Sequence, residues 1–88
     1  MKLKDDFILR TVGGQYLMVA TGGAAAEFNG LVRNNKTANF ILEQLRSDTT
    51  EDAVVSAVLD RYAVPAATAR ADVHQILEQL RDMNALDE

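Results

Sequence analysis

The side chains that could support catalysis in this chain are few and scattered. His74 is the only histidine and the chain holds no cysteine, so the sequence lacks the several His or Cys ligands that a zinc site usually needs, and a lone histidine gives no sign of a catalytic triad. Asp5-Asp6 and Asp87-Glu88 are adjacent acids near the termini, where a carboxylate pair is hard to hold in a fixed geometry. We therefore interpret His74 as a surface or boundary residue and the paired acids as solvated ends.

Two glycine pairs could form either phosphate-binding loops or tight turns. Gly13-Gly14 and Gly22-Gly23 match no phosphate-binding motif, and glycine is also the usual residue of tight turns. We interpret both pairs as turns. The sequence thus predicts a protein without catalytic residues, metal or cofactor, and therefore not an enzyme.

Length and composition favour one small globular domain over residues 1–88. The chain has 88 residues, 48% of them hydrophobic and 25% charged, which is ordinary for a globular protein and atypical of a disordered one. No apolar run approaches the length of a membrane helix, and the charged start is not that of a signal peptide. We expect a cytoplasmic protein with no membrane partner.

The charge is unevenly distributed. Residues 1–36 carry five Lys or Arg and three acids, whereas residues 37–88 carry four Arg and ten acids. Nucleic-acid binding takes much of its affinity from neutralising phosphates, so an acidic second half argues against a nucleic-acid partner.

The first third of the chain reads as strands. Two β-prone runs, Phe7–Val12 and Gln15–Ala20, flank Gly13-Gly14, and this spacing predicts a hairpin with a two-residue turn. Residues 21–29 are small and glycine-containing, which predicts a loop. The run GLVRN at residues 30–34 then predicts a short third strand.

After Asn35 the hydrophobic period changes to that of a helix. We expect Thr37 to cap the first helix, residues 47–50 to offer caps for the second, and Pro65 to lie near the start of the third. The predicted buried faces are Ala38, Ile41, Leu42 and Leu45 in the first helix, Val54, Val55, Val58, Leu59 and Tyr62 in the second, and Ala69, Val73, Ile76, Leu77, Leu80 and Met83 in the third. The resulting fold class is α+β and winged helix-turn-helix-like, with a three-stranded antiparallel sheet followed by three helices.

The short third strand has two interpretations on residue types alone. Its edge can accept a peptide as an additional strand, because edge N–H and C=O groups are unpaired. Its shortness and Arg33 are also ordinary means of discouraging edge pairing, and this protective interpretation is the more common one. The residues alone leave both open.

Four segments in order give the chain a family resemblance. FILRTVGGQYLMVA, FNGLVRNNKTANFILEQL, TTEDAVVSAVLDRYAV and ARADVHQILEQLRDMNAL together are similar to the PqqD-like family, coenzyme PQQ synthesis protein D, over residues 4–86. Leu42 stands where many relatives have tryptophan, and Asn84-Ala85-Leu86 replaces the usual glycine-leucine close. Both departures keep apolar residues, which indicates a divergent member with the same fold.

The resemblance implies a RiPP recognition element, a non-catalytic module that binds the leader of a ribosomally made precursor peptide. In this family the leader resembles an added strand, antiparallel to the third strand and beside the third helix. Carried over by position, the implied peptide-binding residues are Leu31, Val32, Arg33, Asn34, Asp72, Ile76, Gln79, Leu80 and Met83. The backbone at 31–34 would pair with the leader, Ile76, Leu80 and Met83 would form an apolar floor, and Arg33 and Asp72 would read charge.

The implied partners are the precursor peptide and a modifying enzyme, such as a radical SAM protein. Two alternatives remain at this point. One is a winged-helix nucleic-acid-binding domain, which the acids Glu51, Asp52 and Asp60 of the second helix disfavour. The other is a structural domain that self-associates, as a homodimer, through the same strand edge.

Overall fold

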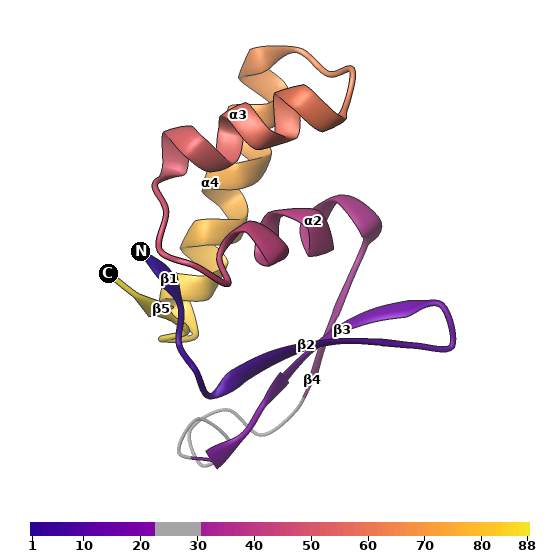
Figure 1. Cartoon of the computed structure of the whole chain (residues 1–88), viewed down its shortest axis with the longest axis vertical. Helices are drawn as coiled ribbons and strands as arrows, with labels where there is room; N and C mark the ends of the chain where they lie inside the picture. Colours follow the sequence, from indigo (N-terminus) through magenta and orange to yellow (C-terminus); the bar gives the residue numbers. More distant parts are fainter. Residues whose placement is uncertain (23–30) are drawn as a thin grey trace.

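The computed structural model describes residues 1–22 and 31–88, with the backbone alone for residues 31–34. The described elements run in the order β1 (Lys2–Leu3), β2 (Phe7–Val12), β3 (Gln15–Ala20), β4 (Leu31–Asn34), α2 (Lys36–Gln44), α3 (Glu51–Arg61), α4 (Ala66–Asp82) and β5 (Leu86–Asp87). Figure 1 shows α2 lying over the strands, α3 beyond it, and the long α4 crossing both helices on its way to β5. This part of the chain confirms the prediction of a mixed fold with three helices and antiparallel strands. Most of the loop predicted at 21–29 lies outside the described residues.

The hairpin forms where the sequence predicts it. Strands β2, β3 and β4 pair antiparallel in that order, and Val12 pairs with Gln15 across the turn. Gly13 and Gly14 have φ angles of +57° and +79°, the two positive values that a type I′ turn requires. Glycine reaches these angles without steric cost, which fixes both the turn and the register of the hairpin.

A second antiparallel ladder joins the two ends of the chain, and sequence analysis missed it. Lys2 pairs with Asp87 and Leu3 with Leu86 in the β1–β5 ladder, so a strand follows the helices where a plain chain end was expected. The Lys4 N–H also donates to the Ala85 carbonyl at 2.9 Å. Strands of two residues show no hydrophobic period, so nothing in the local pattern announces them.

The first helix starts earlier than predicted. Asn35 is its N-cap: its backbone is extended (φ −85°, ψ 175°) and its side chain accepts a hydrogen bond from the Ala38 N–H at 2.7 Å. The prediction that Thr37 caps this helix is therefore wrong, since Thr37 lies within the first turn. The next helix starts as expected, with the Thr50 hydroxyl accepting from the Ala53 N–H at 3.1 Å, and α4 begins directly after Pro65.

Substituting the two candidate caps tests this correction. Asn35→Ala is expected to lower the free energy of unfolding by about 0.5–2 kcal/mol, because an N-terminal N–H of α2 loses its acceptor. Thr37→Ala should cost less, since its hydroxyl caps nothing in this structure. Urea unfolding of both variants makes the comparison, and an equal or larger loss for Thr37→Ala would contradict the Asn35 cap.

The core lies between the sheet and the helices. Phe7, Leu9 and Met18 of the hairpin point into it. The helices and chain ends supply the remaining buried side chains, namely Leu3, Ile41, Leu42, Leu45, Val54, Val55, Val58, Ala69, Val73, Leu77, Leu80, Ala85 and Leu86. Leu59 was predicted to belong here but is 37% exposed, and Tyr62, Ile76 and Met83 pack on the core only in part. No described helix is long and apolar enough to cross a bilayer.

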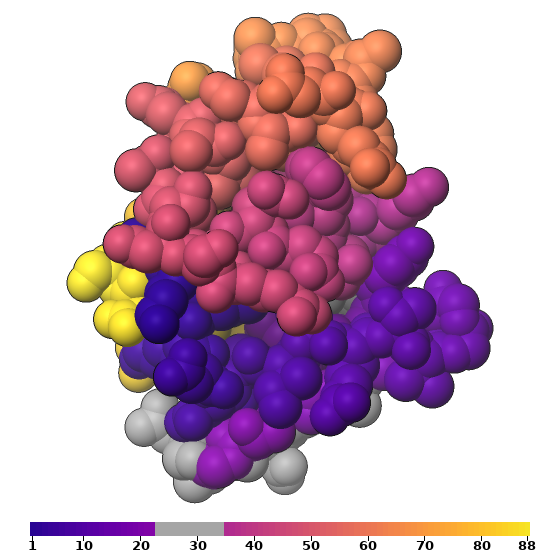
Figure 2. All heavy atoms as spheres, in the orientation of Figure 1, coloured from indigo at the N-terminus to yellow at the C-terminus, as the bar shows by residue number. Residues whose placement is uncertain are grey.

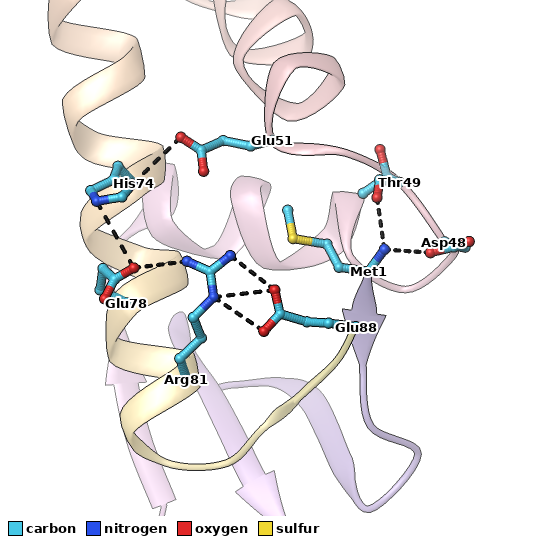
Figure 3. A network of polar contacts seen from close by, with 8 residues as sticks. All are labelled: Met1, Asp48, Thr49, Glu51, His74, Glu78, Arg81 and Glu88. Atoms are coloured by element: carbon cyan, nitrogen blue, oxygen red, sulfur yellow. Dashed lines mark hydrogen bonds and ion pairs between the residues drawn. The ribbon is translucent and has the colours of Figure 1, made fainter.

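Polar contacts tie the chain ends to the helices (Figure 3). Arg81 donates to both carboxylate oxygens of Glu88, and its Nη1 donates to Oε1 of Glu78 at 2.8 Å. The Met1 ammonium contacts the Asp48 carboxylate and the Thr49 carbonyl. His74, whose side chain is 58% exposed, lies between Glu51 and Glu78, which agrees with its interpretation as a surface residue.

Two of these carboxyl groups should make stability depend on acidity. The hydrogen bond from the Met1 ammonium lowers the pKa of Asp48, and hydrogen bonds from Arg81 lower the pKa of Glu88. Groups with a lowered pKa in the folded state stabilise it fully above their ordinary values, 3.8 and 4.5 here, and lose that contribution as the pH falls.

Denaturation by urea between about pH 7 and about pH 3 should therefore show stability falling below the ordinary carboxyl values. Because both groups are exposed, salt should weaken the effect. Glu88→Gln removes one titrating group, and its stability is expected to vary less with pH than that of the unsubstituted chain. Identical pH profiles for the two proteins would contradict a role for the Arg81–Glu88 pair.

Candidate functional site

The hydrogen-bond phase of the hairpin decides which backbone groups of the sheet are free. The type I′ turn makes Val12 and Gln15 a hydrogen-bonded pair, and bonded pairs then recur at every second residue. The far end of the hairpin agrees, because the Thr21 N–H donates to the Asp6 carbonyl at 2.7 Å. The phase is thus fixed at both ends of β2 and β3.

Successive residues of β3 direct their backbone groups alternately to β2 and to β4, so the same alternation fixes which groups of β4 face β3. Tyr16 and Met18 direct their N–H and C=O groups away from β2, toward Asn34 and Val32, their partners in β4. Leu31 and Arg33 consequently turn their N–H and C=O groups to the outer edge of β4, where no described strand pairs with them. Of the four consecutive residues predicted to pair with a peptide, the register leaves these two with outward backbone groups.

The predicted residues of α4 separate into a stripe and a core position. Asp72, Ile76, Gln79 and Met83 are spaced by four, three and four residues, so they lie along one side of the helix. Asp72 and Gln79 are exposed, whereas Ile76 and Met83 are half-buried against the core. This stripe combines two apolar contacts with two polar groups that solvent or a ligand can reach.

Leu80 occupies a different position from the other α4 residues. Its side chain is only 3% exposed and belongs to the core, on the face that also carries Val73 and Leu77. It supports the stripe from beneath. An apolar floor on α4 therefore has Ile76 and Met83 as its accessible members.

Helix α2 connects the two parts of this candidate site. A single residue, Asn35, separates its start from the end of β4, and it packs against β4, the hairpin, α3 and α4. Helix α2 therefore contacts both β4 and α4, the two elements that carry the predicted site residues. Figure 2 shows α2, in magenta to pink, seated directly on the hairpin.

The described part of the chain offers no candidate metal centre. Those residues hold no group of three or more His, Cys, Asp or Glu side chains able to bind a metal ion. A surface hollow of about 340 Å³ lies elsewhere, beside β2, and its lining includes none of the predicted site residues. Sequence analysis did not find this hollow, because its walls come from three separate segments.

The fold has a counterpart among solved structures. The structure "TbiB1 in Complex with the TbiA(beta) Leader Peptide" superposes with a TM-score of 0.78 at 16% sequence identity, covering 99% of this chain and 95% of that one. At this identity the likeness establishes a shared fold. A search of the curated proteins finds no match.

The sequence itself matches one family description. The family "Coenzyme PQQ synthesis protein D (PqqD)" matches residues 8–86, which include nearly all of β2, the strands β3 and β4, the described helices α2, α3 and α4, and the start of β5. That span bears out the resemblance seen in the four sequence segments. The chain belongs to the PqqD family.

Proposed function

We propose that this chain is a RiPP recognition element that binds the leader of a ribosomally made precursor peptide and takes no part in the chemistry itself. Membership of the PqqD family supports a peptide-binding module. The fold shared with TbiB1, whose structure contains the TbiA(beta) leader peptide, supports the same class of ligand. The winged-helix description of the fold is part of this proposal.

The observation that carries the binding mode is the open edge of β4. Leu31 and Arg33 present backbone donors and acceptors outward, spaced two residues apart, which is the pattern that an added strand requires. The leader would lie antiparallel to β4, with its own N–H and C=O groups completing the ladder. Backbone pairing gives affinity with little dependence on sequence, so side chains must supply the specificity.

The stripe of α4 is proposed to supply the specificity for the leader. Ile76 and Met83 offer half-buried apolar contacts, and a methionine side chain adapts readily to different apolar partners. Asp72 and Gln79 would read polar or basic groups of the leader, while Leu80 holds the helix in place from the core. Arg33 and Asp72 together would favour a leader carrying both signs of charge.

The bound leader would then be presented to a modifying enzyme, for which a radical SAM protein is the proposed class. Titration calorimetry tests the binding step, using the synthetic leader of a short precursor encoded beside this chain and the same leader in scrambled order. We expect saturable binding of the native order only. Equal heats from the scrambled leader would contradict specific recognition.

The two alternatives are separated by simple measurements. A nucleic-acid binder needs cations on α3, yet Glu51 and Asp52 occupy its first turn and Arg61 is the only basic residue of this helix. A shift of labelled DNA at low salt would favour that function. Self-association through β4 would instead appear as a sedimentation coefficient that rises with protein concentration and falls when leader is added.

A further inference from the structure

The opposite edge of the sheet is also open. The hydrogen-bond phase that directs Ile8 and Arg10 toward β3 turns the N–H and C=O groups of Leu9 and Thr11 away from it. Among the described residues no backbone group pairs with these two. Phe7 differs, because its N–H donates to the Lys4 carbonyl at 3.1 Å. Strand β2 thus offers two consecutive outward donor–acceptor pairs, like β4.

A hollow adjoins this edge. Its lining comes from the N-terminal segment, β2 and Arg46, which lies just after α2. Its lining contains the apolar residues Leu3, Phe7, Ile8 and Leu9 and the charged residues Lys4, Asp5 and Arg46. A strand added to β2 would place every second side chain on the helix-facing side of the sheet, toward this hollow. The edge therefore has both a backbone ladder and a side-chain contact surface.

The charges around the edge select the occupant. Lys4 and Asp5 carry opposite charges beside the hollow, whereas Arg10 is exposed on the strand itself. Arg10 has no ion-pair partner among the described residues. A second copy paired antiparallel through Leu9 and Thr11 would place the Arg10 of one molecule opposite the Arg10 of the other, and like charges across a strand pair are destabilising. An acidic side chain opposite Arg10 on an added strand is attracted instead.

We propose that the outer edge of β2 is a second docking site, which accepts an extended acidic segment of a partner protein by strand addition. It goes beyond leader binding, since it lies on the other edge of the sheet and uses no residue of the β4–α4 site. Leader and partner can then be held at the same time, one on each edge. The backbone of Leu9 and Thr11 supplies the ladder, and Arg10 selects an acidic side chain opposite it.

A short capped peptide of alternating valine and glutamate is the probe, with its valine–lysine counterpart as the control. Amide NMR of the full chain should show shifts at Leu9 and Thr11 when the acidic peptide is added, and none when the valine–lysine peptide is added. Thr11→Pro removes one outward N–H without touching a hairpin hydrogen bond and is expected to weaken binding by about tenfold. Thr11→Val keeps the N–H and should bind as the unsubstituted chain does.

Charge is tested by a matched pair of substitutions. Arg10→Gln should weaken the acidic peptide by about threefold, and Arg70→Gln, which removes the same charge on α4 far from β2, should leave it unchanged. Equal binding of the lysine peptide, shifts confined to residues 31–34, absence of shifts, or self-association without peptide would each overturn the proposal. Leader binding is read from residues 31 and 33 in the same spectra, so failure at β2 is distinguishable from failure at β4.

Discussion

Arg33→Pro is expected to weaken leader binding by about ten- to hundredfold, because an outward N–H of β4 disappears and the leader carbonyl opposite it loses its donor. Proline is tolerated at this position of an edge strand, since the missing N–H does not face β3. Stability of the free protein should change little. Calorimetry with the synthetic leader and urea unfolding of the free protein measure the two effects separately.

Two further variants isolate the backbone contribution. Arg33→Ala keeps the N–H and removes the side chain, so it should lose less affinity than Arg33→Pro. Val32→Pro deletes an N–H that faces Met18 in β3, so it should lower stability through a broken β3–β4 hydrogen bond. If Val32→Pro impairs leader binding more than Arg33→Pro while leaving stability intact, the hydrogen-bond phase assigned to β4 is wrong.

Leu77→Ala is expected to lower the free energy of unfolding by about 2–5 kcal/mol, as truncation of a fully buried leucine removes apolar contacts and leaves a cavity. Leu77 is 0% exposed, on the face of α4 that meets the other helices. The free energy of unfolding of a domain of this size is small, so a loss of this magnitude is a large fraction of it. Urea unfolding should show a much lower midpoint, and leader affinity of the remaining folded protein should be close to unchanged.

The neighbouring residue provides the matched control. Ile76 is half-buried and belongs to the stripe beside the core, so Ile76→Ala should cost less stability than Leu77→Ala and more leader affinity. The two substitutions remove similar apolar volume from adjacent positions of one helix. A ranking in which Leu77→Ala reduces affinity more than Ile76→Ala, at equal folded fraction, would place the leader elsewhere.

The sequence predicts the elements that have a clear local signal. Gly13-Gly14 between two β-prone runs specifies the hairpin, since only a type I′ turn satisfies both the spacing and the positive φ angles. The helical period places Val54, Val55 and Val58 in the core, as it does Val73 and Leu77. In each case the local preference and the packed fold demand the same conformation.

The features that were missed depend on contacts between distant segments. The β1–β5 ladder joins residues from opposite ends of the chain, and strands so short carry no pattern. Asn35 and Thr37 are both acceptable caps by type, and the extended backbone at Asn35 decides between them. Leu59 satisfies the helical period, yet it remains 37% exposed near the end of α3.

The candidate site was predictable only in part. Residue types left the third strand ambiguous between a docking edge and a protected one, and the family resemblance supplied the α4 residues. Which groups of β4 face outward follows from the pairing of β3 with both of its neighbours, information that no single segment contains. The same pairing exposes the outer edge of β2, for which the sequence offered no signal.

Amide NMR of the full chain during titration with the synthetic leader tests the central claim most directly. The account predicts the largest shifts at Leu31 and Arg33, slowed exchange of those two amides with solvent, and accompanying shifts along Asp72, Ile76, Gln79 and Met83. Residues of the acidic surface around Glu51 and Asp52 should be unaffected. Shifts confined to that surface, or to β2, with residues 31 and 33 unchanged at saturation, would contradict leader binding on β4.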